Sequence, residues 1–129
     1  MKIEITALSK YSSRRPEEKI RQALIQKMVD EWGFPKGLIS VERKSGARRY
    51  DLLCYTREMT PLLLVECKAG AVDEAAISQA LGYNEIIGAP FICVAGAQEI
   101  LTFWHEKGRL ASVPFLPVFG ELYAISRRF

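Results

Sequence analysis

The sequence contains few cysteine and histidine residues. Their positions argue against disulfides, a zinc site and catalysis by a thiol or an imidazole. The three cysteines, Cys54, Cys67 and Cys93, each lie within an apolar run and form no C-x-x-C pair. An odd number of cysteines in such surroundings is typical of buried thiols in a reducing compartment. We therefore expect a cytoplasmic protein without disulfides, a zinc site or a catalytic thiol. The single histidine, His105, has no partner nearby in the sequence, which favours a structural role over catalysis.

Two other kinds of signature are missing. No glycine-rich phosphate-binding motif of the form G-x-x-x-x-G-K-[ST] or G-x-G-x-x-G occurs, so we expect no ATP hydrolysis. No apolar run approaches the ~18 residues that a membrane helix needs, and the first residues lack the apolar core of a signal peptide. The sequence thus predicts neither membrane insertion nor export.

The composition is that of a folded globular chain. Of the 129 residues, 49% are hydrophobic and 26% are charged, and we expect a single domain over residues 1–129. The 18 Lys and Arg against 15 Asp and Glu give a net charge of +3, which permits nucleic-acid binding without requiring it. Basic residues gather in pairs that either contact phosphates or stay solvated: Arg14-Arg15, Arg43-Lys44, Arg48-Arg49 and Arg127-Arg128.

Hydrophobic periodicity and turn residues predict an α/β fold, a mixed sheet flanked by helices. The expected helices cover residues 16–32 and 73–87, and the expected strands cover residues 38–44, 50–56, 61–68, 91–95 and 100–105. The order up to residue 95 is therefore α-β-β-β-α-β, and residues 100–105 add a further strand. Residues 108–129 have no clear pattern, and we expect this C-terminal extension to cover a sheet edge or to take part in an oligomer contact.

The first predicted helix presents an acidic side chain on its packing face. At about 100° per residue, Glu17 shares one face with the residues that should pack on the sheet, which are Ile20, Arg21, Leu24 and Met28. Glu18 falls outside this face, and we expect it to point toward solvent.

The predicted hairpin of residues 50–68 brings acidic residues together. Asp51 and Glu66 lie equally far from the middle of the turn, so they should face each other across the antiparallel pair. Side chains alternate along a strand, which puts Lys68 on the same face as Glu66. These three side chains should converge at the end of the hairpin away from its turn.

Opposed carboxylates repel, and a cation offsets that repulsion. Hard oxygen ligands favour Mg²⁺ or Mn²⁺, with the main-chain carbonyl of Cys67 and the carboxylate of Glu17 as further ligands. Lys68 could then orient or deprotonate an attacking water, or stabilise charge on a phosphate in its transition state. The structural alternative is that Lys68 merely neutralises Asp51 and Glu66 at the rim of the sheet.

Four segments follow one another along the chain: residues 15–22, 49–53, 64–69 and 79–84. In this order they resemble the N-terminal nuclease domain of type I restriction enzyme R subunits, a member of the PD-(D/E)XK nuclease superfamily. The similarity covers about residues 14–104, although Tyr50 stands where the superfamily's name has proline. The resemblance implies an αβββαβ restriction-endonuclease-like core and a Mg²⁺-dependent DNA endonuclease.

The resemblance also implies roles for individual residues. Asp51 and Glu66 would be metal ligands, Lys68 the catalytic lysine and Glu17 the acid of the first helix. Gln79 and Tyr83 match a Q-x-x-x-Y motif, in which they contact a phosphate or hold Lys68; alternatively the tyrosine simply packs in the core. Further phosphate contacts are expected from Arg14, Arg15, Lys44, Arg48 and Arg49.

Relatives of this kind are usually fused to an ATP-driven motor, of which this sequence carries no motif. We therefore consider three functions. The first is an active DNA endonuclease, which would need a homodimer or two visits to cut both strands. The second is a catalytically inert nucleic-acid-binding module with the same fold. The third is an assembly protein whose working surface is the apolar segment of residues 113–123.

Overall fold

The computed structural model describes residues 16–41 and 51–128. Its elements are α1 (Pro16–Asp30), the 3-10 helix η2 (Lys36–Leu38), β1 (Ile39–Val41), β2 (Leu52–Tyr55), β3 (Pro61–Cys67), α2 (Glu74–Ile87), β4 (Phe91–Ala95), β5 (Ile100–Glu106), β6 (Arg109–Val113) and α3 (Phe119–Ser126). Among the helices of these residues, none is both long and apolar enough to cross a membrane.

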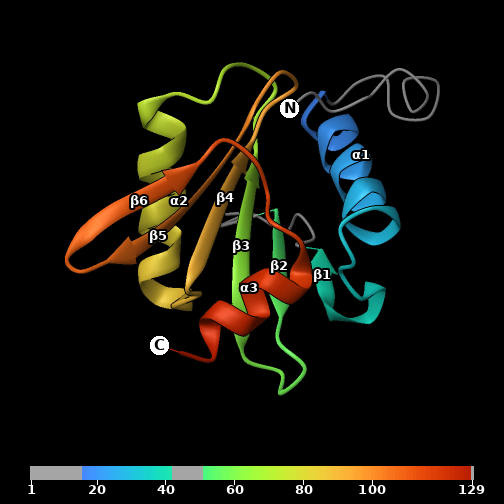
Figure 1. Ribbon diagram of the computed structural model, residues 1–129. Coiled ribbons are helices and arrows are strands. Elements are labelled where there is room, and N and C mark those ends of the chain that lie inside the picture. The colour runs from blue at the N-terminus through green and yellow to red at the C-terminus, as the bar shows by residue number, and fades with distance from the viewer. Residues whose placement is uncertain (1–15, 42–50, 129) are drawn as a thin grey trace.

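The six strands form one mixed sheet in the order in which they occur along the chain. β3 and β4 are parallel and are joined by the crossover helix α2, whereas every other neighbouring pair is antiparallel. The carboxyl ends of β3 and β4 therefore lie at the same edge, which is the upper edge in Figure 1. This confirms the predicted α/β fold with a mixed sheet.

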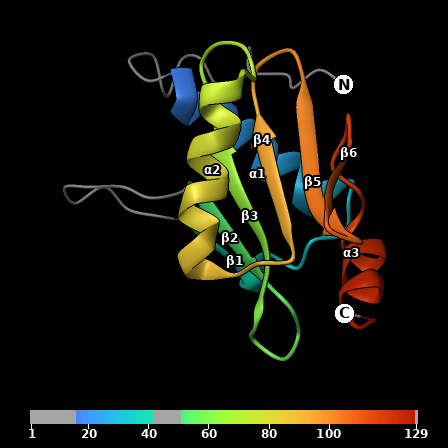
Figure 2. The ribbon, with the colours of Figure 1, turned by 90° about the vertical axis from the view of Figure 1, so that its left-hand side faces the viewer.

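Helices cover both faces of the sheet (Figure 2). The core on one face contains side chains of α1 and α3, and the core on the other face contains side chains of α2. The apolar run Leu62–Val65 of β3 is fully buried, because a central strand must fill both layers at once.

The hairpin of β2 and β3 has the register that the sequence predicts. Leu52 pairs with Val65 and Leu53 with Leu64, and the N–H of Asp51, the residue before β2, donates to the carbonyl of Val65. A bulge between Cys54 and Tyr55 shifts the register only near the turn. The expected strand of residues 38–44 is present as β1 over Ile39–Val41, and its last residues lie outside the described part of the chain.

The C-terminal extension contributes a strand and a helix to the fold. β6 continues the sheet beyond β5, and α3 packs on the face that α1 covers. Leu116, Phe119 and Leu122 are at most 3% exposed. The sequence predicts no helix or strand in this segment, because its apolar residues contact distant parts of the chain rather than forming a long local pattern.

Candidate metal and phosphate site

Asp51 lies at the point where the pairing of β2 with β3 ends. Its N–H donates a hydrogen bond of 3.0 Å to the carbonyl of Val65. Its carboxylate Oδ2 accepts a hydrogen bond of 2.7 Å from the main-chain N–H of Cys67. The side chain is 1% exposed, so the carboxylate is held against β3 within the protein. This contact places Asp51 against β3 at Cys67, the residue after Glu66, and the convergence of Asp51, Glu66 and Lys68 stays a prediction.

Glu66 lies on β3, and Lys68 is the first residue of the loop after β3. Glu66 is 4% exposed and Lys68 is partly exposed. Leu64 belongs to the core under α2, so the alternation of side chains directs Glu66 to the same layer. The N–H of Lys68 donates to the carbonyl of Ala95 at 2.8 Å, which continues the pairing of β3 with β4 past Cys67.

The pKa of the Cys67 thiol is raised by burial and changed further by the charged groups around it. Burial raises its pKa most, Asp51, Cys93 and Glu66 raise it further in that order, and the positive charge of Arg21 lowers it. Since the pKa is well above its ordinary value, the thiol stays protonated and is no nucleophile at neutral pH.

Arg21 is the residue near this site that the sequence analysis did not single out, and it corrects the expectation for Glu18. Glu18 does not point to solvent: its side chain is 23% exposed and forms an ion pair with the 17% exposed side chain of Arg21. A half-buried cation on the packing face of α1 attracts the nearest carboxylate on its own helix. The helical wheel did place Arg21 beside Glu17 on that face, which was the available signal.

Glu17 is half-buried on α1. The side chains of α1 that pack on the sheet share a core with Cys67, whereas Glu66 faces the layer of α2. Within residues 16–41 and 51–128, no three His, Cys, Asp or Glu side chains are grouped so that they could hold a metal ion. A site in this region would therefore use two carboxylates, with the remaining ligands from the main chain and water.

The predicted pairing on α2 is present. Gln79 Nε2 donates a hydrogen bond of 2.9 Å to the hydroxyl oxygen of Tyr83. Gln79 is exposed, and Tyr83 is half-buried against the core that contains Leu64. Because the tyrosine oxygen accepts from the amide, its own O–H can donate to another group. All five basic residues predicted to contact phosphates lie outside the described residues: Arg14, Arg15, Lys44, Arg48 and Arg49.

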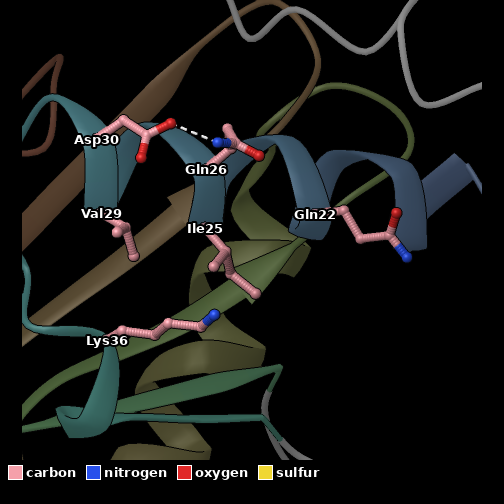
Figure 3. Close-up of a pocket in the computed structure, with 6 residues that line it drawn as sticks. All are labelled: Gln22, Ile25, Gln26, Val29, Asp30 and Lys36. Atoms are coloured by element: carbon pink, nitrogen blue, oxygen red, sulfur yellow. Dashed lines mark hydrogen bonds between the residues drawn. The ribbon is translucent and has the colours of Figure 1, made fainter.

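A hollow of about 270 Å³ lies elsewhere, along the exposed side of α1 (Figure 3). It is lined by Gln22, Ile25, Gln26, Val29, Asp30 and Lys36. None of these side chains belongs to the acidic site. Its polar rim includes the hydrogen bond from Gln26 to Asp30, which the close-up shows along the helix. This hollow has no constellation of catalytic or metal-binding groups.

Comparisons with known proteins place the chain among restriction enzyme domains. A family model described as type I restriction enzyme R protein N terminus matches residues 16–117. The fold resembles a solved fragment described as an HsdR subunit of a type I restriction enzyme from Vibrio vulnificus YJ016, with a TM-score of 0.64 and 23% identity. The match covers 84% of this chain and 24% of that one, so this chain spans about a quarter of its length. A search of curated proteins finds no match.

Proposed function

The chain belongs to the family of type I restriction enzyme R protein N-terminal domains, and from this we propose that it hydrolyses DNA phosphodiester bonds with the help of a divalent cation. The proposal gives DNA as the substrate and Mg²⁺ or Mn²⁺ as the cofactor. A homodimer, or two successive visits, would allow one site per chain to cut both strands.

The observation that carries the proposal is the placement of Asp51 and Glu66. Both carboxylates are nearly fully buried, and Oδ2 of Asp51 accepts from the N–H of Cys67, the residue after Glu66. Carboxylate oxygens held in this way are the hard ligands that a divalent cation takes in proteins.

The donor set suits a magnesium ion. Mg²⁺ keeps several waters and is commonly bound by one or two carboxylates together with substrate phosphates. Asp51 and Glu66 would hold it, with the Cys67 carbonyl as a third ligand and Glu17 as a further carboxylate contacting a bound water. When bound, the ion would supply positive charge at a phosphate oxygen and a more acidic water.

The remaining groups of the chain would act on the DNA backbone. The ammonium of Lys68 would orient the attacking water and stabilise the charge that develops on the phosphate oxygens. The O–H of Tyr83, whose oxygen accepts from Gln79, would donate to a neighbouring phosphate. Arg15, Lys44, Arg48 and Arg49 would contact the phosphates on either side and set the position of the duplex rather than select a sequence.

Nicking of supercoiled plasmid DNA tests the proposal. We expect nicking with Mg²⁺ or Mn²⁺, loss of nicking on chelation, and at least a hundredfold slower nicking by Lys68→Ala, in line with the contribution of a single charged group in a transition state. Lys36→Ala is the matched control, because Lys36 is an exposed lysine outside the acidic site.

Two outcomes would overturn the proposal. Full activity of Lys68→Ala would remove the role of the lysine. Salt-dependent DNA binding without cleavage in either metal would instead identify an inert binding module with this fold.

A further inference from the structure

Two loops meet at the edge of the sheet where Lys68 lies. One follows β3 and spans residues 68–73, and the other follows β4 and spans residues 96–99. Because β3 and β4 are parallel, both loops leave the sheet at the same edge, at the top of Figure 1. Whatever holds these loops together also holds the main chain of Lys68.

Hydrogen bonds join the loops at both ends. At the start, the N–H of Lys68 donates to the carbonyl of Ala95 at 2.8 Å. Toward the end, the N–H of Val72 donates to Oε1 of Glu99 at 3.2 Å. Glu99 is itself fixed, because its carbonyl accepts the N–H of Gly96 at 2.9 Å.

Between these bonds the two main chains approach so closely that only glycine fits at position 96. A Cβ on Gly96 would lie 2.8 Å from the carbonyl oxygen of Gly70 and 3.3 Å from Cγ2 of Val72. The first contact is with main-chain atoms, so it cannot be relieved by rotating a side chain. Gly70, on the opposite side of the contact, has open space where its own Cβ would stand.

The position of the Lys68 ammonium depends on this packing. Within residues 16–41 and 51–128, the ammonium makes no hydrogen bond or ion pair that would hold it from its far end. Its place relative to Asp51 and Glu66 is therefore set by the main chain at residue 68. That main chain is held by Ala95 at the end of β4, and the residues that follow it, Gly70 and Val72, are held by the loop after β4.

We propose that Gly96 is a positioning residue, which holds the catalytic Lys68 in place by allowing the loop after β4 to pack directly on the carbonyl of Gly70. This rests on the proposed function, because it takes Lys68 as a group that acts on the phosphate. Gly96 contacts neither DNA nor metal and acts only through the loop that follows Lys68.

The test compares Gly96→Ala with Gly70→Ala in the full chain. Each change adds one methyl group to a loop glycine, but only in Gly96→Ala does this group meet main-chain atoms, because a Cβ on Gly70 stands in open space. We expect Gly96→Ala to lower kcat for plasmid nicking by about 10- to 100-fold, since a displacement of ~1 Å at a catalytic group has that effect. We expect KM for DNA and the affinity for Mn²⁺, measured by calorimetry, to stay within twofold of the wild type. Gly70→Ala should match the wild type in all three.

Hydrogen exchange gives a readout that does not depend on cleavage. The amides of Lys68 and Val72 should exchange at least tenfold faster in Gly96→Ala and at the wild-type rate in Gly70→Ala. Should wild-type protein fail to nick DNA, the proposed function would fail, while the exchange rates would still decide whether Gly96 fixes the main chain of Lys68.

Glu99→Ala serves as a second variant in case Gly96→Ala does not fold. It removes the acceptor of the Val72 N–H from an exposed position and adds no clash. It should also lower kcat, with unchanged KM and Mn²⁺ affinity. Equal kcat in Gly96→Ala, Glu99→Ala and the wild type would overturn the proposal, and so would loss of Mn²⁺ binding in step with kcat, because that would indicate general damage to the site.

Discussion

The carboxylate of Asp51 accepts the main-chain N–H of Cys67 at 2.7 Å, at the step where β2 no longer supplies a partner to β3. One side chain thus completes the hydrogen bonding of the strand and brings a negative charge next to Glu66. A residue with both tasks can be tested for each of them separately.

Substitutions of Asp51 should separate structure from metal binding. Asp51→Ala leaves the buried N–H of Cys67 without its acceptor, so the free energy of unfolding should fall by about 1–3 kcal/mol in urea denaturation. Asp51→Asn keeps an acceptor oxygen and should stay within about 1 kcal/mol of the wild type. Calorimetry should show loss of Mn²⁺ binding in both variants.

Asp73→Ala is the control for stability in the Asp51 experiment. Asp73 caps α2 by accepting the N–H of Ala76 at 2.9 Å, so its loss should cost about 1 kcal/mol while Mn²⁺ binding is retained. Wild-type Mn²⁺ affinity in Asp51→Asn would show that the Asp51 carboxylate is not a ligand.

The ion pair of Arg21 with Glu18 should contribute more to stability than other pairs on the same helix. Arg21→Gln leaves a half-buried carboxylate without its cation, and the free energy of unfolding should fall by about 1–3 kcal/mol. Lys27→Gln removes the same charge from a pair in which Glu31 is 57% exposed, and should change stability by less than about 0.5 kcal/mol. Equal effects in urea denaturation would mean that the burial of Arg21 is energetically unimportant.

The docking of α3 should depend on its apolar side rather than on its polar contacts. Phe119 is 3% exposed and packs against Phe34 and Tyr123, with ring centres 5.6 and 5.7 Å away. Phe119→Ala should lower the free energy of unfolding by about 3–5 kcal/mol.

Tyr123→Phe tests the polar side of α3. The Tyr123 hydroxyl donates to Glu58 at 2.5 Å in an exposed setting, so its loss should cost less than about 1 kcal/mol in the same urea experiment. A larger loss in Tyr123→Phe than in Phe119→Ala would reverse this assignment.

The buried thiols should be unreactive until the protein unfolds. Burial raises the pKa of the Cys93 thiol to about 12, although a hydrogen bond with Thr102 acts in the opposite direction. Since only the thiolate attacks a disulfide reagent, labelling at pH 8 should be limited by unfolding and should speed up with added urea. Fast labelling of native protein would contradict the burial of Cys54, Cys67 and Cys93.

The raised pKa of Cys93 also determines how the free energy of unfolding changes with pH. The pKa of Cys93 is higher in the folded state than its ordinary value of 9.0, so its contribution to stability is present below pH 9.0 and is lost as the pH rises toward 12. The free energy of unfolding should therefore fall above pH 9, and less steeply in Cys93→Ala than in the wild type.

The sequence by itself determined the elements and the pairing that place the acidic residues. Alternation along two strands and a turn between them is local information, so the register that pairs Leu52 with Val65 could be predicted from spacing alone. The i, i+4 contact of Gln79 with Tyr83 is equally local, because the geometry of a helix fixes it.

Only the tertiary structure decided the contacts between segments that are distant in the sequence. Three features depend on which face of the sheet each helix covers. They are the burial of Arg21 with Glu18, the packing of α3, and the side of the sheet on which Glu17 of α1 lies relative to Glu66. The approach of Gly96 to Gly70 depends on how far apart two loops leave the sheet. The hydrophobic periodicity of the sequence does not predict the distances between such segments. These distances depend on side-chain volumes and main-chain hydrogen bonds in the packed layers.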